Sequence, residues 1–95
     1  MSADVTANAE REKRRVRILA LVAEILELDD PNSIRSTDRL REDLGMDSLG
    51  SLELLSTISE ELKLDLEMEA AMGISTVDEA FAFIEKNYAE QHGNE

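Results

Sequence analysis

The chain has 95 residues, no cysteine, a single histidine and a formal net charge of −12. This length fits one modest domain, the missing cysteines exclude disulfides and cysteine-based metal sites, and the negative charge argues against nucleic acid as a partner. Acid–base catalysis at neutral pH usually relies on histidine or on buried carboxylates, so we expect neither an enzyme nor a metal site.

Large rings are scarce, because aromatic residues make up only 3% of the chain. A core of aliphatic side chains suits packed helices better than a sheet. The best candidate for a membrane span, residues 18–23, is too short to cross a bilayer, and no signal-peptide pattern opens the chain. We therefore expect an all-α, cytoplasmic protein that does not bind membranes.

Residues 1–9 are small and polar without periodicity, which predicts a disordered tail. Good helix formers without Gly or Pro follow over residues 10–28, and their apolar residues share one helix face: Ile18, Leu21, Val22, Ile25 and Leu28. This helix should end near Pro31, because the residue before a proline is pushed out of the α region.

A basic cluster occupies residues 11–17 of this first helix. Residues 1–17 carry five basic and three acidic groups, whereas the rest of the chain carries 19 acidic and five basic ones. The cluster could contact nucleic acid or a membrane surface. We favour the structural interpretation, in which it is a solvated helix start that pairs with the acidic body of the protein.

Residues 31–47 are rich in loop-forming Asn, Ser, Thr, Asp and Gly. Three apolar residues within this segment, Ile34, Leu40 and Leu44, would anchor it to the core. A loop this long is usually functional or disordered, and the anchors favour function. A second helix should follow from about Ser48 to Leu62, with Asp47 or Ser48 as its N-cap.

The remaining elements are shorter. Residues 67–72 predict a short helix ended by the glycine that follows. Ser75 or Thr76 should cap a last helix that ends near Tyr88, with a polar tail over 91–95. Three substantial helices and one short helix predict a four-helix bundle that forms a single domain over residues 10–90.

The segment 43–49, Asp-Leu-Gly-Met-Asp-Ser-Leu, places the hydroxyl of Ser48 at a helix start with Asp47 beside it. Free backbone N–H groups and a partial positive charge at this position favour an attached phosphate. Asp47 would help to hold a divalent cation during a phosphoryl transfer. No His or Lys lies nearby in sequence to activate Ser48, so the hydroxyl is better suited to accept a group delivered by another enzyme.

Segment 43–49 resembles the attachment motif of acyl carrier proteins, in which the serine of Asp-Ser-Leu carries 4′-phosphopantetheine. Residues 52–54, Leu-Glu-Leu, resemble the family's recognition helix, and residues 74–77, Ile-Ser-Thr-Val, resemble the start of its last helix. The spacing between the two landmarks is also that of the family. The resemblance covers residues 16–87 and indicates a free-standing, monomeric carrier with the family's four-helix bundle.

The resemblance implies that a phosphopantetheinyl transferase moves the arm from coenzyme A to Ser48, beside Asp47. The thiol of the arm would then carry acyl groups as thioesters to acyl-transferring and condensing enzymes with basic docking surfaces. Candidate contacts to these partners are Met46, Leu49, Leu52, Glu53, Ser56 and Glu60. Simpler alternatives remain open, namely a plain helix cap for Ser48, core packing for Leu52 and a solvated helix face for Glu60.

The acyl chain could be sheltered between the helices, as in some members of the family, with Leu54, Ile58, Ile74 and Phe81 as candidate wall residues. Two departures from the family's common pattern are Gly50 and Ser56, which we expect on the exposed side of the recognition helix. They suggest a dedicated pathway, polyketide or other secondary metabolism, in place of ordinary fatty acid synthesis.

Other functions compete with this interpretation, and one of them is an adaptor that carries no modification. Carriers of aminoacyl or peptidyl groups usually have Gly-Gly before the residue that precedes the modified serine, whereas residues 44–47, Leu-Gly-Met-Asp, are closer to the acyl type. A calcium-binding protein would fit the acidity, but no segment has the ligand spacing of an EF-hand loop.

Overall fold

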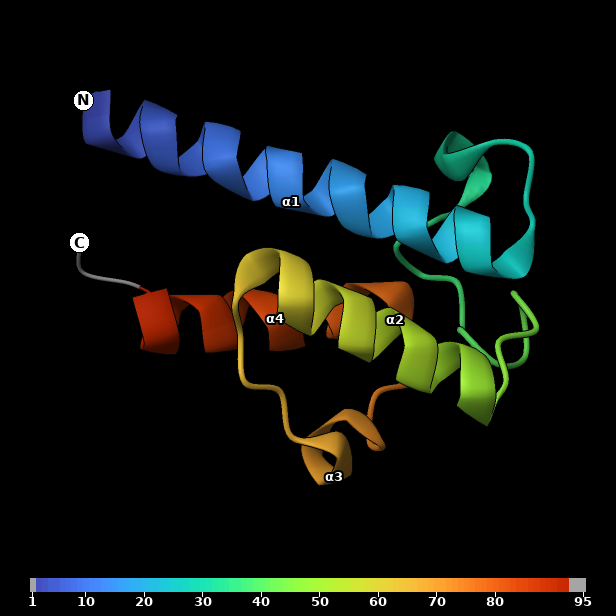
Figure 1. The fold of residues 1–95 in the computed structure, drawn as a ribbon. Helices are drawn as coiled ribbons and strands as arrows, with labels where there is room; N and C mark the ends of the chain where they lie inside the picture. Colours follow the sequence, from blue (N-terminus) through green and yellow to red (C-terminus); the bar gives the residue numbers. More distant parts are fainter. Residues whose placement is uncertain (1, 93–95) are drawn as a thin grey trace.

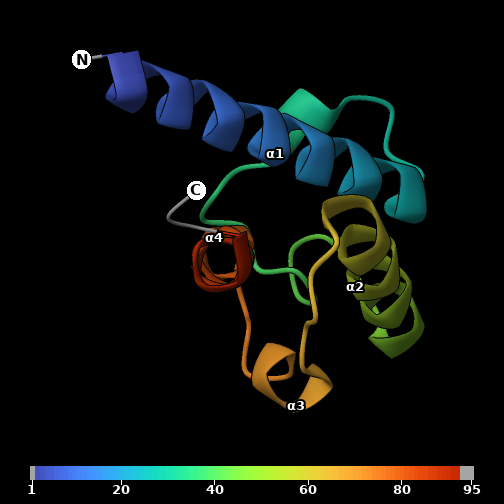
Figure 2. The same cartoon turned by 60° about the vertical axis from the view of Figure 1, so that its left-hand side comes forward.

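The computed structural model describes the backbone of residues 2–92 and the side chains of residues 9–92. Its helices are α1 (Ser2–Leu26), a 3₁₀ turn (Pro31–Ser33), α2 (Ser48–Leu62), α3 (Met68–Ala71) and α4 (Val77–His92). In Figure 1, α2 and α4 run in the opposite direction to α1, and Figure 2 shows α3 on the side away from α1. Residues 2–92 contain no β-strand beyond an isolated bridge. The predicted all-α four-helix bundle is confirmed.

The first helix both begins and ends earlier than the sequence predicted. Its helical backbone starts at Ser2 instead of Glu10, so the expected change from an irregular tail to a helix is not seen in the backbone. It ends at Leu26 because Glu27 adopts a left-handed conformation, with φ of 58°, of the kind that closes helix C-termini. The helix therefore stops through a local cap, before Pro31 can act on it.

The last helix extends beyond its predicted end near Tyr88. The Gln91 side chain accepts a hydrogen bond from the backbone N–H of Asp65 at 2.8 Å and donates one to its carbonyl at 2.9 Å. A ring nitrogen of His92 lies 2.8 Å from the carbonyl oxygen of Lys63. Residues 91 and 92 therefore belong to α4. The domain limits at residues 10 and 90 stay a prediction.

The loop between α1 and α2 is tied to the start of α4. The N–H of Leu40 donates to the carbonyl of Ser75 at 2.8 Å, and the N–H of Val77 donates to the carbonyl of Asp38 at 3.0 Å. Ile34 is buried, and the other two predicted anchors pack against the core. This confirms the predicted anchoring, and it gives the segment that leads to residue 48 a defined path.

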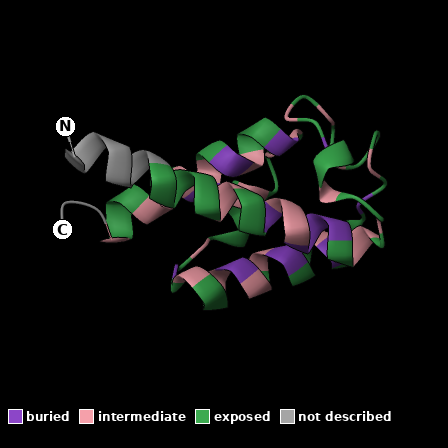
Figure 3. Cartoon of the chain, turned by 90° about the horizontal axis from the view of Figure 1, so that it is seen from above, coloured by how far each residue is buried: buried purple, intermediate pink, exposed green. Residues whose placement is uncertain are grey.

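The core lies between α1, α2 and α4, and each contributes a buried stripe (Figure 3). Its most deeply buried side chains include Ile18, Leu21 and Val22 of α1, Leu54 and Ile58 of α2, and Val77, Phe81 and Ile84 of α4. The three α1 residues are among those that the helical spacing placed on one face. Over residues 2–92, no helix combines the length and the apolarity that a membrane span requires.

Two arginines of the basic cluster clamp α1 to the other helices. Arg14 donates two hydrogen bonds of 2.7 Å to the carboxylate of Glu85, and its guanidinium lies 4.0 Å from the centre of the Tyr88 ring. Arg17 donates to both oxygens of Glu61 at 2.7 and 2.6 Å. These bonds lower the pKa of Glu61 from its ordinary value. The structural interpretation of the basic cluster is supported for both residues.

Candidate functional site

The turn before α2 is held by backbone geometry. Gly45 has φ of 76°, in the left-handed region where a side chain would be strained. The N–H of Met46 donates to the carbonyl of Leu40 at 2.8 Å, and the Met46 side chain is only 2% exposed. Met46 therefore packs in the core and positions the two residues that follow it. Its role as a contact for partners stays a prediction, which this burial does not favour.

Asp47 is the N-cap of α2. Its backbone is extended, and its carboxylate accepts a hydrogen bond from the N–H of Gly50 at 2.8 Å. Ser48 is therefore the first residue of the helix proper, and it is exposed. Because Asp47 satisfies the cap, the hydroxyl of Ser48 is not needed for capping. The structure thus chooses Asp47 from the two N-cap candidates.

The remaining predicted contact residues lie along the outer side of α2. Leu49 is 72% exposed and Leu52 is 43% exposed, so the core interpretation of Leu52 is wrong. Glu53, Ser56 and Glu60 are also exposed. They form one accessible surface with Ser48 at its end.

Gly50, in contrast, is buried, which corrects the expectation that it lies on the exposed side. A Cβ atom added there would lie 3.2 Å from Oδ1 of Asp47 and 3.4 Å from side-chain atoms of Ile25 and Met46. A larger residue at this position would push against the capping carboxylate and α1. The glycine is therefore explained by close packing of the helix start.

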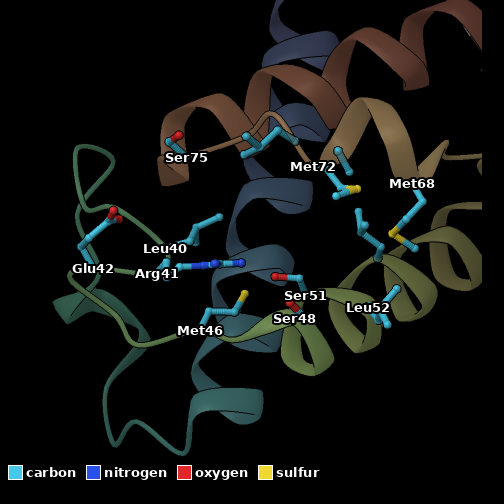
Figure 4. Close-up of a pocket in the computed structure, with 13 residues that line it drawn as sticks. Leu40, Arg41, Glu42, Met46, Ser48, Ser51, Leu52, Met68, Met72 and Ser75 are labelled. Carbon is cyan, nitrogen blue, oxygen red and sulfur yellow. The ribbon is translucent and has the colours of Figure 1, made fainter.

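A pocket of about 600 Å³ opens beside Ser48. It is bounded by α2, α3 and the loop that leads into α2 (Figure 4). Of the wall residues expected from sequence, only Ile74 lines it, while Leu54, Ile58 and Phe81 lie in the core. The other apolar residues of the lining are Leu40, Met46, Leu52, Leu55, Met68, Ala71 and Met72. The sequence does contain a signal for this pair: Met68 and Met72 are four residues apart, a spacing that places two side chains on the same face of a helix.

One ion pair near the site, between Arg39 and Asp43, holds the loop that leads to α2. The backbone N–H of Arg39 donates to Asp43 at 2.8 Å and lowers the pKa of that carboxyl from its ordinary value, and the Arg39 guanidinium, 3.5 Å away, adds to the effect. Across the part of the chain that the structure describes, no cluster of three His, Cys, Asp or Glu residues could hold a metal ion. The site presents the exposed Ser48 at the start of α2, with a hydroxyl that can accept a transferred group.

Comparison with known proteins identifies the class of this domain. Residues 16–84 match the family model described as a phosphopantetheine attachment site. The matched segment contains the whole of α2 and α3, with Ser48 exposed at the start of α2. The fold and the match together define a phosphopantetheine-binding carrier domain.

Full-length relatives narrow this class. A protein assigned as a mitochondrial acyl carrier protein in Schizosaccharomyces pombe is 34% identical over 71 residues, which cover 75% of this chain and 63% of that protein. The acyl carrier protein of Prochlorococcus marinus is 35% identical over 69 residues, which cover 73% of this chain and 85% of that protein. The chain belongs to the acyl carrier protein family, whose members carry covalently attached 4′-phosphopantetheine and are generally non-catalytic. It spans less than two thirds of the yeast relative's length.

Proposed function

We propose that Ser48 is the residue that carries the 4′-phosphopantetheine arm. The observation that carries this proposal is the position of its exposed hydroxyl at the first residue of α2, inside the matched attachment domain. The N–H groups of the first helical turn and the helix dipole favour a phosphodiester there. Asp47 stays beside it, fixed by its bond to Gly50.

The attachment step needs an external enzyme, which we propose is a phosphopantetheinyl transferase. The Ser48 oxygen forms a bond to the phosphorus next to the pantetheine half of coenzyme A. The phosphoanhydride bond breaks, the nucleotide half leaves, and the hydroxyl proton passes to a base of the transferase. Among the described residues, the only histidine is His92, which binds Lys63 at the far end of α2. The chain itself therefore offers no imidazole for this proton.

Once attached, the arm supplies a thiol that holds acyl groups as thioesters, the nucleophile that this cysteine-free chain lacks. The chain's own contribution is presentation. The exposed apolar side chains of Leu49 and Leu52 give a partner enzyme surface to bury, and Glu53 and Glu60 attract basic docking surfaces. The pocket beside Ser48 is large enough to shelter a short acyl chain.

The pathway is proposed to be polyketide or other secondary metabolism rather than fatty acid synthesis. Of the two departures that suggested this, only exposed Ser56 still supports a changed docking surface, because Gly50 is buried for packing reasons. Normal acylation by standard fatty acid synthesis partners would contradict this part of the proposal. The expected cytoplasmic location and monomeric state stay predictions, and one relative is assigned to mitochondria.

A carrier for aminoacyl or peptidyl groups is the alternative, and it shares the arm and the attachment residue. The two functions differ in the enzyme that loads the thiol. Loading of the modified protein by an amino-acid-activating enzyme, with no transfer from acyl-loading enzymes, would favour the alternative.

The attachment is tested by incubation of the protein with coenzyme A and a broad-specificity transferase, followed by intact-mass measurement. We expect the mass of one arm on the wild type and no gain on Ser48→Ala. Ser51→Ala is the matched control, because it removes the next hydroxyl along the helix and should be modified normally. Modification of Ser48→Ala, or no modification of the wild type, would refute the assignment.

A further inference from the structure

The pocket beside Ser48 has a polar and an apolar part. Arg41, Ser51 and Ser75 line it together with Ser48, whereas Leu55 and Met72 belong to its apolar lining. In Figure 4 the Arg41 side chain points across the pocket toward Ser51, and Met68 and Met72 lie at the other side. A container for saturated hydrocarbon alone would not need a guanidinium and hydroxyls in its wall.

Three arginines form no ion pair with the described residues, Arg15, Arg35 and Arg41, and of these only Arg41 lines the pocket beside Ser48. Arg14 and Arg17 clamp helices, and Arg39 lies 3.5 Å from Asp43, but no carboxylate of residues 9–92 lies within 4.0 Å of Arg41. Glu42 also lines the pocket, but Figure 4 shows its carboxylate turned away from Arg41. The guanidinium of Arg41 is therefore available to a ligand in the pocket, although acids outnumber bases by 22 to 10 over the whole chain.

The two serines offer further donors. Hydroxyls that bond within the described part of the protein are those of Ser33, Thr57, Ser59 and Thr76. The hydroxyls of Ser51 and Ser75 have no such bond, although both line the pocket. The polar part of the wall therefore presents one cation and two hydroxyl groups that have no hydrogen-bond partner among the described residues.

We propose that Arg41 determines cargo specificity, and that this pocket takes acyl groups that carry acceptor oxygens, keto or carboxylate, in place of saturated chains. This inference rests on the proposed attachment of the arm to Ser48. The occupant is the carrier's own tethered acyl group, with its oxygens toward Arg41, Ser51 and Ser75 and its carbon chain toward the methionines. Methionine side chains adapt to irregular apolar shapes, so the chain length is not tightly fixed.

The physical basis is the difference in desolvation. A saturated chain in the pocket displaces water from the guanidinium and the hydroxyls and gives them no partner. An acyl group with acceptor oxygens replaces those hydrogen bonds, and a carboxylate pairs with the planar guanidinium through two of them. Because Arg41 is exposed to solvent, the preference is modest: roughly fivefold in the ratio of sheltered to free chain.

The experiment compares acyl groups of equal carbon number on the full chain: hexanoyl, 5-oxohexanoyl and the half-thioester of hexanedioic acid. Each is loaded from its coenzyme A derivative, and intact mass confirms one acylated arm before any other measurement. The sheltered fraction is then measured by NMR, from shifts of the Met68 and Met72 methyl groups and their contacts to the chain. We expect both oxygenated groups to be sheltered more than hexanoyl.

Variants identify the residue responsible. Arg41→Met should lower the sheltered-to-free ratio of the oxygenated groups about fivefold relative to that of hexanoyl. The ratio for hexanoyl itself should stay the same or rise, because the variant has no guanidinium to be desolvated. The matched control is Arg35→Met, which removes the same charge from the same loop but from a residue outside the pocket, and it should have no effect. Ser75→Ala should lower the sheltered-to-free ratio of the 5-oxohexanoyl group by a smaller factor. Comparison of the 5-oxohexanoyl group with the hexanedioic acid group shows whether the pocket prefers a keto oxygen or a carboxylate.

Three results would overturn the inference. The first is equal or better sheltering of hexanoyl, and the second is an equal effect of Arg35→Met. The third is a change in the Met68 and Met72 methyl shifts, caused by Arg41→Met, that is as large when the arm carries no acyl group. Arg41 would then bind the phosphodiester and not the cargo. Failure to load the arm on Ser48 would instead refute the proposed function, and with it this inference, and the mass would show it first.

Discussion

The two ends of α2 are covered very differently. At its first turns Leu49 is 72% exposed and Leu52 is 43% exposed, beside an open pocket. At its other end Ile58 is 1% exposed, and Glu61 is held by two hydrogen bonds from Arg17. The helix is therefore held by core packing and by Arg17 toward its far end, and it leaves its outer face accessible near Ser48, although Gly50 packs against α1 there.

This difference separates stability from function along a single helix. Side chains that pack in the core contribute most of the free energy of folding, whereas exposed apolar side chains contribute little to it and indicate a surface for interaction. We expect substitutions at the packed end to change stability, and substitutions at the Ser48 end to change modification by the transferase and binding of partners. The predictions below test that separation.

The largest effect should come from Ile58→Ala. It leaves a cavity in the core and should lower the free energy of unfolding by about 2–5 kcal/mol, measured by urea denaturation. Leu49→Ala is the matched control, since it truncates an apolar residue on the same helix and should change stability by less than about 0.5 kcal/mol. It should still slow modification of Ser48 by several-fold. A large loss of stability in Leu49→Ala would contradict the separation.

A smaller loss is expected for Arg14→Met, which keeps an apolar side chain over Tyr88 but removes the two hydrogen bonds to Glu85. The Glu85 side chain is only 23% exposed, and the variant leaves its carboxylate with the longer contact from Arg11, at 3.8 Å. We expect a loss of about 1–2 kcal/mol in urea denaturation. Arg17→Met removes the more exposed of the two ion pairs and should therefore lower the free energy of unfolding by less. A larger loss in Arg17→Met than in Arg14→Met would argue against burial as the cause of the difference.

Gly45→Ala tests the turn at the open end. The alanine must adopt φ of 76°, so stability should fall by about 1 kcal/mol. Gly73→Ala is the control, because a Cβ there meets nothing closer than 3.9 Å and φ is not positive. If the two variants were equally stable, the positive φ at residue 45 would not be the reason that the turn before Ser48 needs a glycine.

Much of the fold could be predicted from sequence because its determinants are local. The helical spacing of apolar residues identified the buried face of α1, and α2 spans Ser48–Leu62 as expected. The N-cap was narrowed to two neighbours, and geometry selected Asp47. A hydroxyl at the start of this helix followed from the same local pattern.

What could not be predicted depends on contacts between distant segments. Met46 is buried because the loop binds the start of α4 through Leu40 and Ser75, and neighbouring residues carry no sign of that bond. Gly50 is buried against α1 for the same kind of reason. The last helix extends to His92 because Gln91 binds the backbone of Asp65, a contact between residues 26 positions apart.

The smallest predicted effect concerns pH at the packed end. The bonds from Arg17 hold the pKa of Glu61 below its ordinary value of 4.5, so the ionised form is favoured more in the folded state than in the unfolded state. The contribution of this pair is therefore complete above pH 4.5 and is lost as the pH falls through the lowered pKa. In urea denaturation between pH 7 and pH 3, Glu61→Gln should lose stability at neutral pH and should show a shallower decline in acid than the wild type. Glu60→Gln, which removes an exposed neighbouring acid without an ion pair among the described residues, should follow the wild-type decline. An equal change in both variants would mean that net charge, and not the clamp on α2, causes the acid sensitivity.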